Sequence, residues 1–121
     1  MVVLPFTLCT VAPIAAHHSD SNVATDRVVT VEGELRDVLF INPHVTLVVA
    51  APGGDIYRVE WAEPRRLVRL GVTKTTLHAG DRIRVVASPS RDPGDRTLSL
   101  VREVRRAADG WHWDRGSTVI D

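Results

Sequence analysis

Residues 28–36 read VVTVEGELR, and this stretch decides the fold of the chain. Apolar or small residues occupy every second position, so one face carries Val29, Val31, Gly33 and Leu35. The residues between them are hydroxyl-bearing or charged and fall on the opposite face. A period of two with one apolar face is typical of a β-strand that is buried on one side. The stretch therefore predicts a half-buried strand.

The apolar pattern changes parity after Leu35. Val38 and Phe40 continue it, although each lies an odd number of positions beyond Leu35. One extra residue in a strand shifts the alternation in this way, so we expect a bulge or sharp bend near residues 36–37. Gly33 would ease the curvature, because it has no side chain to pack.

Four later segments also alternate, and they predict further strands. These segments are residues 45–49, 57–61, 83–87 and 98–104. Residues 63–71 do not follow the two-residue period of the strands. They have Pro64 near the start and Gly71 at the end, which are typical first and last residues of a short helix. We expect the arginines of this helix to face solvent while two leucines, Leu67 and Leu70, cap the core.

Three strands, a short helix and two more strands is the element order of an OB-type barrel. In that barrel the helix lies between the third and fourth strands, and a long bent first strand helps the sheet to close. We therefore predict an all-β fold with one short helix, a small OB-like β-barrel of five strands, as a single domain over residues 28–121. A different meander barrel or a sandwich is the alternative.

Residues 1–16 contain no charged side chain and carry a short apolar run. The run is too short to span a bilayer, which takes about 20 apolar residues, but it suits the core of a secretory signal. Because Ala15 and Ala16 fit a cleavage site, we predict a signal peptide over residues 1–16 and a flexible tail over residues 17–27. The predicted location is periplasmic or secreted, with no membrane span after cleavage. The alternative is a hydrophobic first strand, against which two prolines argue.

The single cysteine and the balanced charge exclude several classes of function. Cys9 lies inside the predicted leader, so the mature chain would have no disulfide, thiolate metal site or cysteine nucleophile. Basic and acidic residues both number 15, which gives a net charge of +0. A chain with no net charge has no long-range attraction to nucleic acid or to an anionic membrane, so we expect no nucleic-acid partner.

Short motifs are spread along the mature chain. They are Ala16-His17-His18-Ser19, Phe40-Ile41-Asn42-Pro43-His44, the spaced set Glu60, Pro64, Leu67, Arg69 and Gly71, the set Leu77, Gly80, Asp81 and Val85, and the pairs Arg91-Asp92 and Asp109-Gly110. Together they resemble the domain-of-unknown-function 6152 family, small exported bacterial proteins with a signal peptide. The chain departs from that pattern where Asp20 and Val72 replace an aromatic residue and a tryptophan. The resemblance implies an exported single domain and no established activity.

Three histidines form the sharpest candidate site. Cleavage after Ala16 would leave His17 at the N-terminus, where its amine and its imidazole can chelate a metal with one further imidazole. Cleavage after Ala15 would instead place His18 third, which is another copper-binding pattern. Nitrogen ligands suit Cu(II) or Zn(II), and we expect His17, His18 and His44 to supply them. The alternative is that His44 belongs to a turn and the N-terminal histidines to a polar tail.

Aromatic residues form a second candidate surface. A barrel that docks a ligand or a partner would use Tyr57, Trp61, Trp111 and Trp113 as its contact surface. The simplest interpretation of Trp111 and Trp113 is that they pack one end of the barrel core, and the alternative is that they form a stacking platform for a ligand.

The helix carries a cluster of arginines, Arg65, Arg66 and Arg69. The simplest interpretation is a solvated helix face, and the functional alternative is contact with an anion or a partner.

Common catalytic motifs are missing from the sequence, which holds no nucleophile elbow, phosphate-binding loop or Ser-His-Asp spacing. We therefore expect an exported binding module without catalytic activity, with Cu(II) or Zn(II) held by His17, His18 and His44. The alternative is a metal-free protein-interaction or ligand-docking barrel of the cell envelope, whose partner is an envelope protein or a small ligand.

Overall fold

In the computed structural model, which describes residues 20–116, the alternating stretch forms strand β1 (Val29–Leu39). The expected bend is confirmed, because the pairing of β1 with its neighbour shifts register between Leu35 and Asp37. Gly33 lies against the neighbouring strand, where an added Cβ would come 2.8 Å from the carbonyl carbon of Ala50. Only glycine allows so close an approach of two backbones. The bend lets the two halves of β1 pair with different strands.

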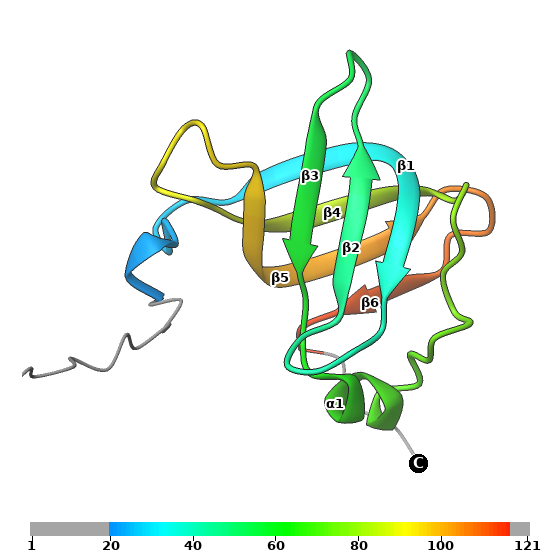
Figure 1. The fold of residues 1–121 in the computed structure, drawn as a ribbon. Coiled ribbons are helices and arrows are strands. Elements are labelled where there is room, and N and C mark those ends of the chain that lie inside the picture. The colour runs from blue at the N-terminus through cyan, green and yellow to red at the C-terminus, as the bar shows by residue number, and fades with distance from the viewer. Residues whose placement is uncertain (1–19, 117–121) are drawn as a thin grey trace, which may run out of the picture.

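Five strands close into a mixed barrel, which confirms the predicted fold class (Figure 1). The other four are β2 (Thr46–Ala50), β3 (Ile56–Glu60), β4 (Arg82–Pro89) and β5 (Thr97–Arg106). The first half of β1 pairs with β4 and the second half with β2, both antiparallel. Strand β2 then pairs with β3, and β4 pairs with β5. A short parallel contact between β3 and β5 completes the circuit.

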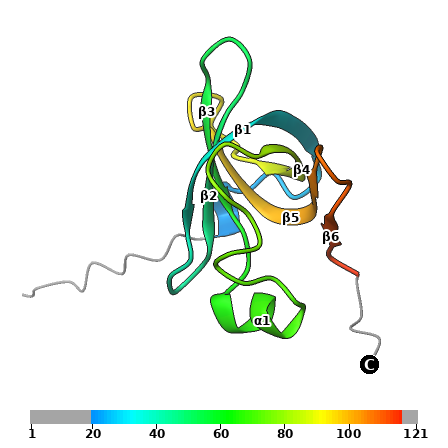
Figure 2. The same cartoon turned by 90° about the vertical axis from the view of Figure 1, so that its right-hand side faces the viewer.

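The predicted helix is confirmed as α1 (Pro64–Arg69), which lies between β3 and β4 and is shorter than expected at both ends. It lies at the end of the barrel where the β1–β2 loop also turns (Figures 1 and 2). Leu67 is fully buried and Leu70 packs against the core, as expected of the residues that cap the barrel. Gly71 follows with φ of +81°, a conformation that glycine adopts without strain.

The sheet contains a sixth strand beyond the predicted five, β6 (His112–Asp114). It pairs antiparallel with the second half of β5, so that Val104 lies opposite Trp113. A turn at Asp109 and Gly110 connects the two strands. Strand β6 therefore extends the sheet outside the closed barrel and brings a tryptophan into the core.

The described part of the N-terminal segment lies along the connection between β4 and β5. It begins with a 3-10 turn, η1 (Asp20–Asn22), and the amide of Ala24 then donates to the carbonyl of Pro89 over 2.9 Å. The amide of Arg91 donates in turn to the carbonyl of Asn22 over 2.8 Å. His17 and His18 lie outside the described residues, as does the predicted signal peptide.

Over residues 20–116, no helix is long and apolar enough to cross a membrane.

Candidate binding groove

The seam of the barrel opens where β5 leaves β3. Their parallel pairing ends at Val59 and Leu98, and β5 then bulges, because its register against β4 shifts between Val86 and Ser88. Leu100 lies at this bulge with φ of +49°. A left-handed backbone costs a non-glycine residue about 1–2 kcal/mol, and strain of this kind gathers at functional sites. Beyond the bulge, β5 pairs with β6 instead, so the ends of β3 and β6 face each other across a gap.

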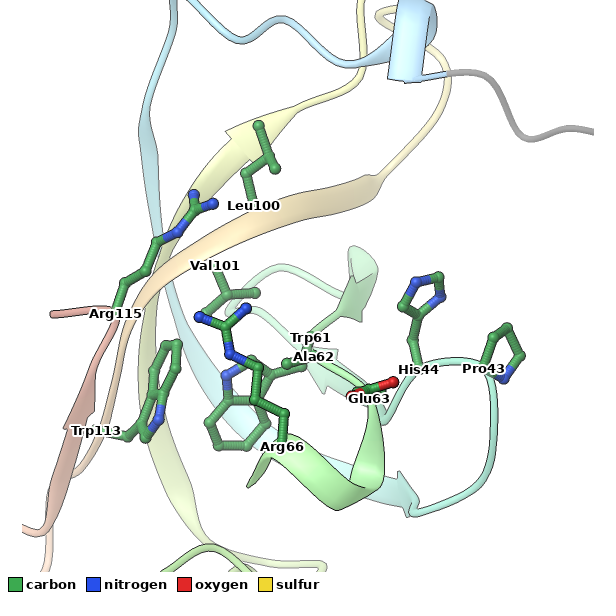
Figure 3. Close-up of a pocket in the computed structure, with 10 residues that line it drawn as sticks. All are labelled: Pro43, His44, Trp61, Ala62, Glu63, Arg66, Leu100, Val101, Trp113 and Arg115. Carbon is green, nitrogen blue, oxygen red and sulfur yellow. The ribbon is translucent and has the colours of Figure 1, made fainter. Parts of the chain in front are cut away.

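A groove of about 500 Å³ lies at this gap, and we call it the barrel-end groove (Figure 3). It is built from the β1–β2 loop, the end of β3, the start of α1, the bulge in β5 and the end of β6. Its lining residues are Pro43, His44, Trp61, Ala62, Glu63, Arg66, Leu100, Val101, Trp113 and Arg115. Four segments that are far apart in the sequence, residues 43–44, 61–66, 100–101 and 113–115, therefore meet at one hollow.

Two tryptophans form the inner wall of the groove. The ring centroids of Trp61 and Trp113 lie 5.2 Å apart at an interplanar angle of 82°, the edge-to-face arrangement that aromatic pairs prefer. Each side chain is more than nine-tenths buried, with 7% and 5% of its surface exposed. Both indole Nε1 atoms are buried without a hydrogen-bond partner in the part of the chain that the structure describes. A buried donor left unpaired costs about 1–3 kcal/mol, so this wall carries unused hydrogen-bonding capacity.

The outer wall of the groove is polar and mainly cationic. Arg66 reaches from α1 and Arg115 from the residue after β6, and both extend toward Leu100 and Val101 (Figure 3). Both arginines are exposed, and within residues 20–116 neither guanidinium makes a hydrogen bond or an ion pair. Glu63 lies on the other side of the groove, near His44, and is likewise unpaired within that range. The groove thus has two free cations against one carboxylate.

The structure brings His44, Trp61 and Trp113 together at the groove but leaves Tyr57 and Trp111 elsewhere. Tyr57 lines a separate hollow of about 540 Å³ between the start of β1 and the β4–β5 connection. In that hollow Arg96 and Asp55 form an ion pair of 3.2 Å, and a second arginine, Arg27, shares the lining with Asp92 and Asp95.

Trp111 also lies outside the groove. The guanidinium of Arg106 lies 5.7 Å from the centroid of its ring, within the range of a cation–π contact. Arg106 also donates to the carbonyl of Thr76 over 2.6 Å and forms an ion pair of 2.9 Å with Asp109. The hydrogen bond from Arg106, with a second from the amide of Trp111, lowers the pKa of Asp109 to about 2. Trp111 therefore belongs to a clamp that ties the β5–β6 turn to the loop before β4.

The groove also holds residues that the sequence did not assign to a site, among them Arg115 and Leu100. Arg66 was considered only as a member of the helix cluster, for which contact with an anion or a partner was the alternative to a solvated face. No local pattern marks Arg115, because its place in the groove depends on the pairing of β6 with β5. The bulge at Leu100 is equally invisible to periodicity, which places Leu98 and Leu100 on one face although Leu98 is buried and Leu100 is exposed.

The predicted metal site has one member in the described part of the chain. His44 is exposed in the β1–β2 loop, just after the cis peptide bond between Asn42 and Pro43. Among residues 20–116, no group of three or more His, Cys, Asp or Glu side chains is placed to hold a metal ion. A site at His44 would therefore depend on His17 and His18.

Comparison with known proteins gives one match. A model of the family of unknown function DUF6152 matches residues 6–99 of the chain. No curated protein and no solved structure matches it. The matched range includes His44, Trp61 and Arg66 but ends before Trp113 and Arg115, so the groove joins the family region to the β6 hairpin that follows it.

Proposed function

Because the chain belongs to the family of unknown function DUF6152, whose description names no activity, we propose its function from the barrel-end groove itself. The protein is an exported binding module without catalytic activity, and its ligand is a small molecule held in that groove. Export is proposed from the leader-like composition of residues 1–16 and from the small residues Ala15 and Ala16 at its end.

One observation carries the proposal: the wall formed by Trp61 and Trp113 lies in a hollow that four separate segments build. Small-molecule sites are concave, mostly apolar and carry a few polar groups that fix orientation. The groove combines two tryptophans and aliphatic side chains with a larger polar share than is usual, and its volume of about 500 Å³ falls in the range of such sites. A flat surface that docks a folded protein would not need such a hollow.

The three tryptophans provide a direct test by NMR. Titrating ¹⁵N-labelled protein with a library of small-molecule fragments should move the indole N–H signals of Trp61 and Trp113, because both rings line the groove. The signal of Trp111 should stay in place, since that ring lies in the Arg106 clamp and serves as an internal control. Shifts that spread evenly over the surface, or that gather in the hollow at Tyr57, would overturn the proposal.

Copper or zinc binding is a second candidate function, favoured by the exposure of His44 on the rim of the groove. We expect protein with the N-terminus that export produces to take up about one equivalent of Cu(II) in a calorimetric titration. His17→Ala and His44→Ala should each weaken the affinity, whereas His78→Ala, which removes another exposed histidine, should not. The same preparation gives the cleavage site by mass and N-terminal sequencing. Equal Cu(II) uptake by protein with an N-terminal tag would rule out a ligand set that includes the terminal amine.

A further inference from the structure

We propose that the barrel-end groove binds an amphipathic organic anion, a small molecule with a carboxylate or phosphate head group on an apolar body. This inference rests on the proposed function, because it names the ligand class of the same groove. The head group lies between Arg66 and Arg115, and the apolar body lies against Leu100, Val101 and the two indoles.

The free guanidinium groups indicate an anionic head group. A guanidinium binds a carboxylate or a phosphate through two parallel hydrogen bonds, which is its strongest and most specific pairing. Some arginines of the sheet already have carboxylate partners, since Arg84 pairs with Glu32 and Glu103, and Arg106 pairs with Asp109. Others, such as Arg58 and Arg102, have none within residues 20–116, so Arg66 and Arg115 differ from them in lining one hollow together. Arg66 and Arg115 come from different elements to one hollow, and no acceptor is provided for them by the described residues.

Two buried indole donors lie beside those cations. Nε1 of Trp61 and Nε1 of Trp113 are buried at the groove and lack acceptors within residues 20–116. In Figure 3 the nitrogen of Trp61 lies on the edge of its ring nearest Arg66 and Trp113. Both nitrogens are fully buried, so a ligand oxygen would reach them only if the rings moved. The accessible donors at this end of the groove are therefore the two guanidinium groups, and their complement is a ligand that brings oxygen acceptors, as an ionised head group does.

The apolar body is indicated by the residues beside the cations. Leu100 is an exposed leucine that the bulge turns outward at the groove, and Val101 next to it is buried. A simple inorganic anion would leave this leucine and the indole faces in water, whereas an alkyl or aromatic body would cover them. Glu63 lies on the other side of the groove, beside His44, and it repels a head group from that end.

Isothermal titration calorimetry with four probes tests the inference on the full exported chain. The probes are decanoate, decyl phosphate, 1-decanol and acetate, each below the concentration at which it aggregates. We expect decanoate or decyl phosphate to bind, and the preference between them identifies the head group. Decanol lacks the charge and acetate lacks the apolar body, so both should bind at least about tenfold more weakly. Added salt should weaken the binding of the anion, because Arg66 and Arg115 are exposed.

Matched arginine variants assign the effect to the groove. Arg66→Gln and Arg115→Gln should each weaken anion binding about tenfold, because each removes one charge-assisted contact. The controls are Arg65→Gln on the same helix and Arg102→Gln on β5, which are exposed and do not line the groove, and they should stay within about twofold. Glu63→Gln should bind the anion at least as tightly as the parent, since it removes a repulsive charge.

The outcomes separate this inference from the function on which it rests. Equal binding of decanol and decanoate, or unchanged affinity in both groove variants, overturns the anionic ligand and leaves the groove as a binding site. Binding only to anionic vesicles or to an acidic peptide, and not to the monomeric probes, also overturns the inference. If no probe binds and the fragment titration leaves the signals of Trp61 and Trp113 in place, the proposed function fails as well.

Discussion

Gly33→Ala should lower the free energy of unfolding by about 3 kcal/mol, toward the upper end for overpacked core positions. The added Cβ would come 2.8 Å from the carbonyl carbon of Ala50, and it would come closer still to the carbonyl oxygen. The obstacle is backbone, which cannot rotate away as a side chain does, so β1 and β2 must separate at the bend of the barrel. For a domain of this size the midpoint of thermal unfolding should fall by about 12 °C or more.

Gly94→Ala is the matched control for this substitution. Gly94 lies in the exposed connection between β4 and β5, and its added Cβ would meet only a side-chain oxygen of Asp92 at 3.4 Å. That contact is tolerable, so we expect the free energy of unfolding to change by less than about 1 kcal/mol. A small increase also fits, because alanine restricts the conformations of the unfolded chain. Thermal unfolding followed by circular dichroism compares the two variants. If both have the same midpoint, the close approach at Gly33 does not set the curvature of β1.

The barrel could be predicted from the sequence because its determinants are local. The parity change after Leu35 is a one-residue signal, and it corresponds to the register shift that lets β1 pair with both β4 and β2. Pro64 and Gly71 mark the ends of the helix segment in the same direct way. Each of these features depends on a few neighbouring residues, so the pattern along the chain was enough to place them.

The groove could not be predicted because it depends on contacts between distant segments. Trp61 and Trp113 were each recognised as candidate site residues, but nothing in the sequence shows that their rings meet edge to face. Their meeting requires β6 to pair with the second half of β5, which in turn requires the bulge at Leu100. A leucine carries no signal for a left-handed backbone, as glycine or asparagine would. The sequence therefore predicted the five strands of the barrel but not the sixth strand, which completes the site.

Leu67→Ala should lower the free energy of unfolding by about 3 kcal/mol, a typical cost for a buried leucine truncated to alanine. Leu67 is fully buried, and it is the buried residue of a helix of six residues. A helix so short is unstable without tertiary contacts, so α1 depends on this anchor. Val68→Ala on the same helix is the matched control, because Val68 is 51% exposed and its truncation should cost less than about 0.5 kcal/mol. Urea unfolding followed by tryptophan fluorescence measures both changes.

The same variant tests whether α1 is a structural wall of the groove. Leu67 does not line the groove, but Arg66 does, and it is positioned only as long as α1 stays docked. In conditions where Leu67→Ala is still folded, its α1 amides should exchange with deuterium faster than those of β1 and β4, and it should bind decanoate more weakly. Val68→Ala should change neither property. If Leu67→Ala frees the helix and the affinity for decanoate is unchanged, then Arg66 acts without being positioned by α1, and the anion is held mainly from the Arg115 side.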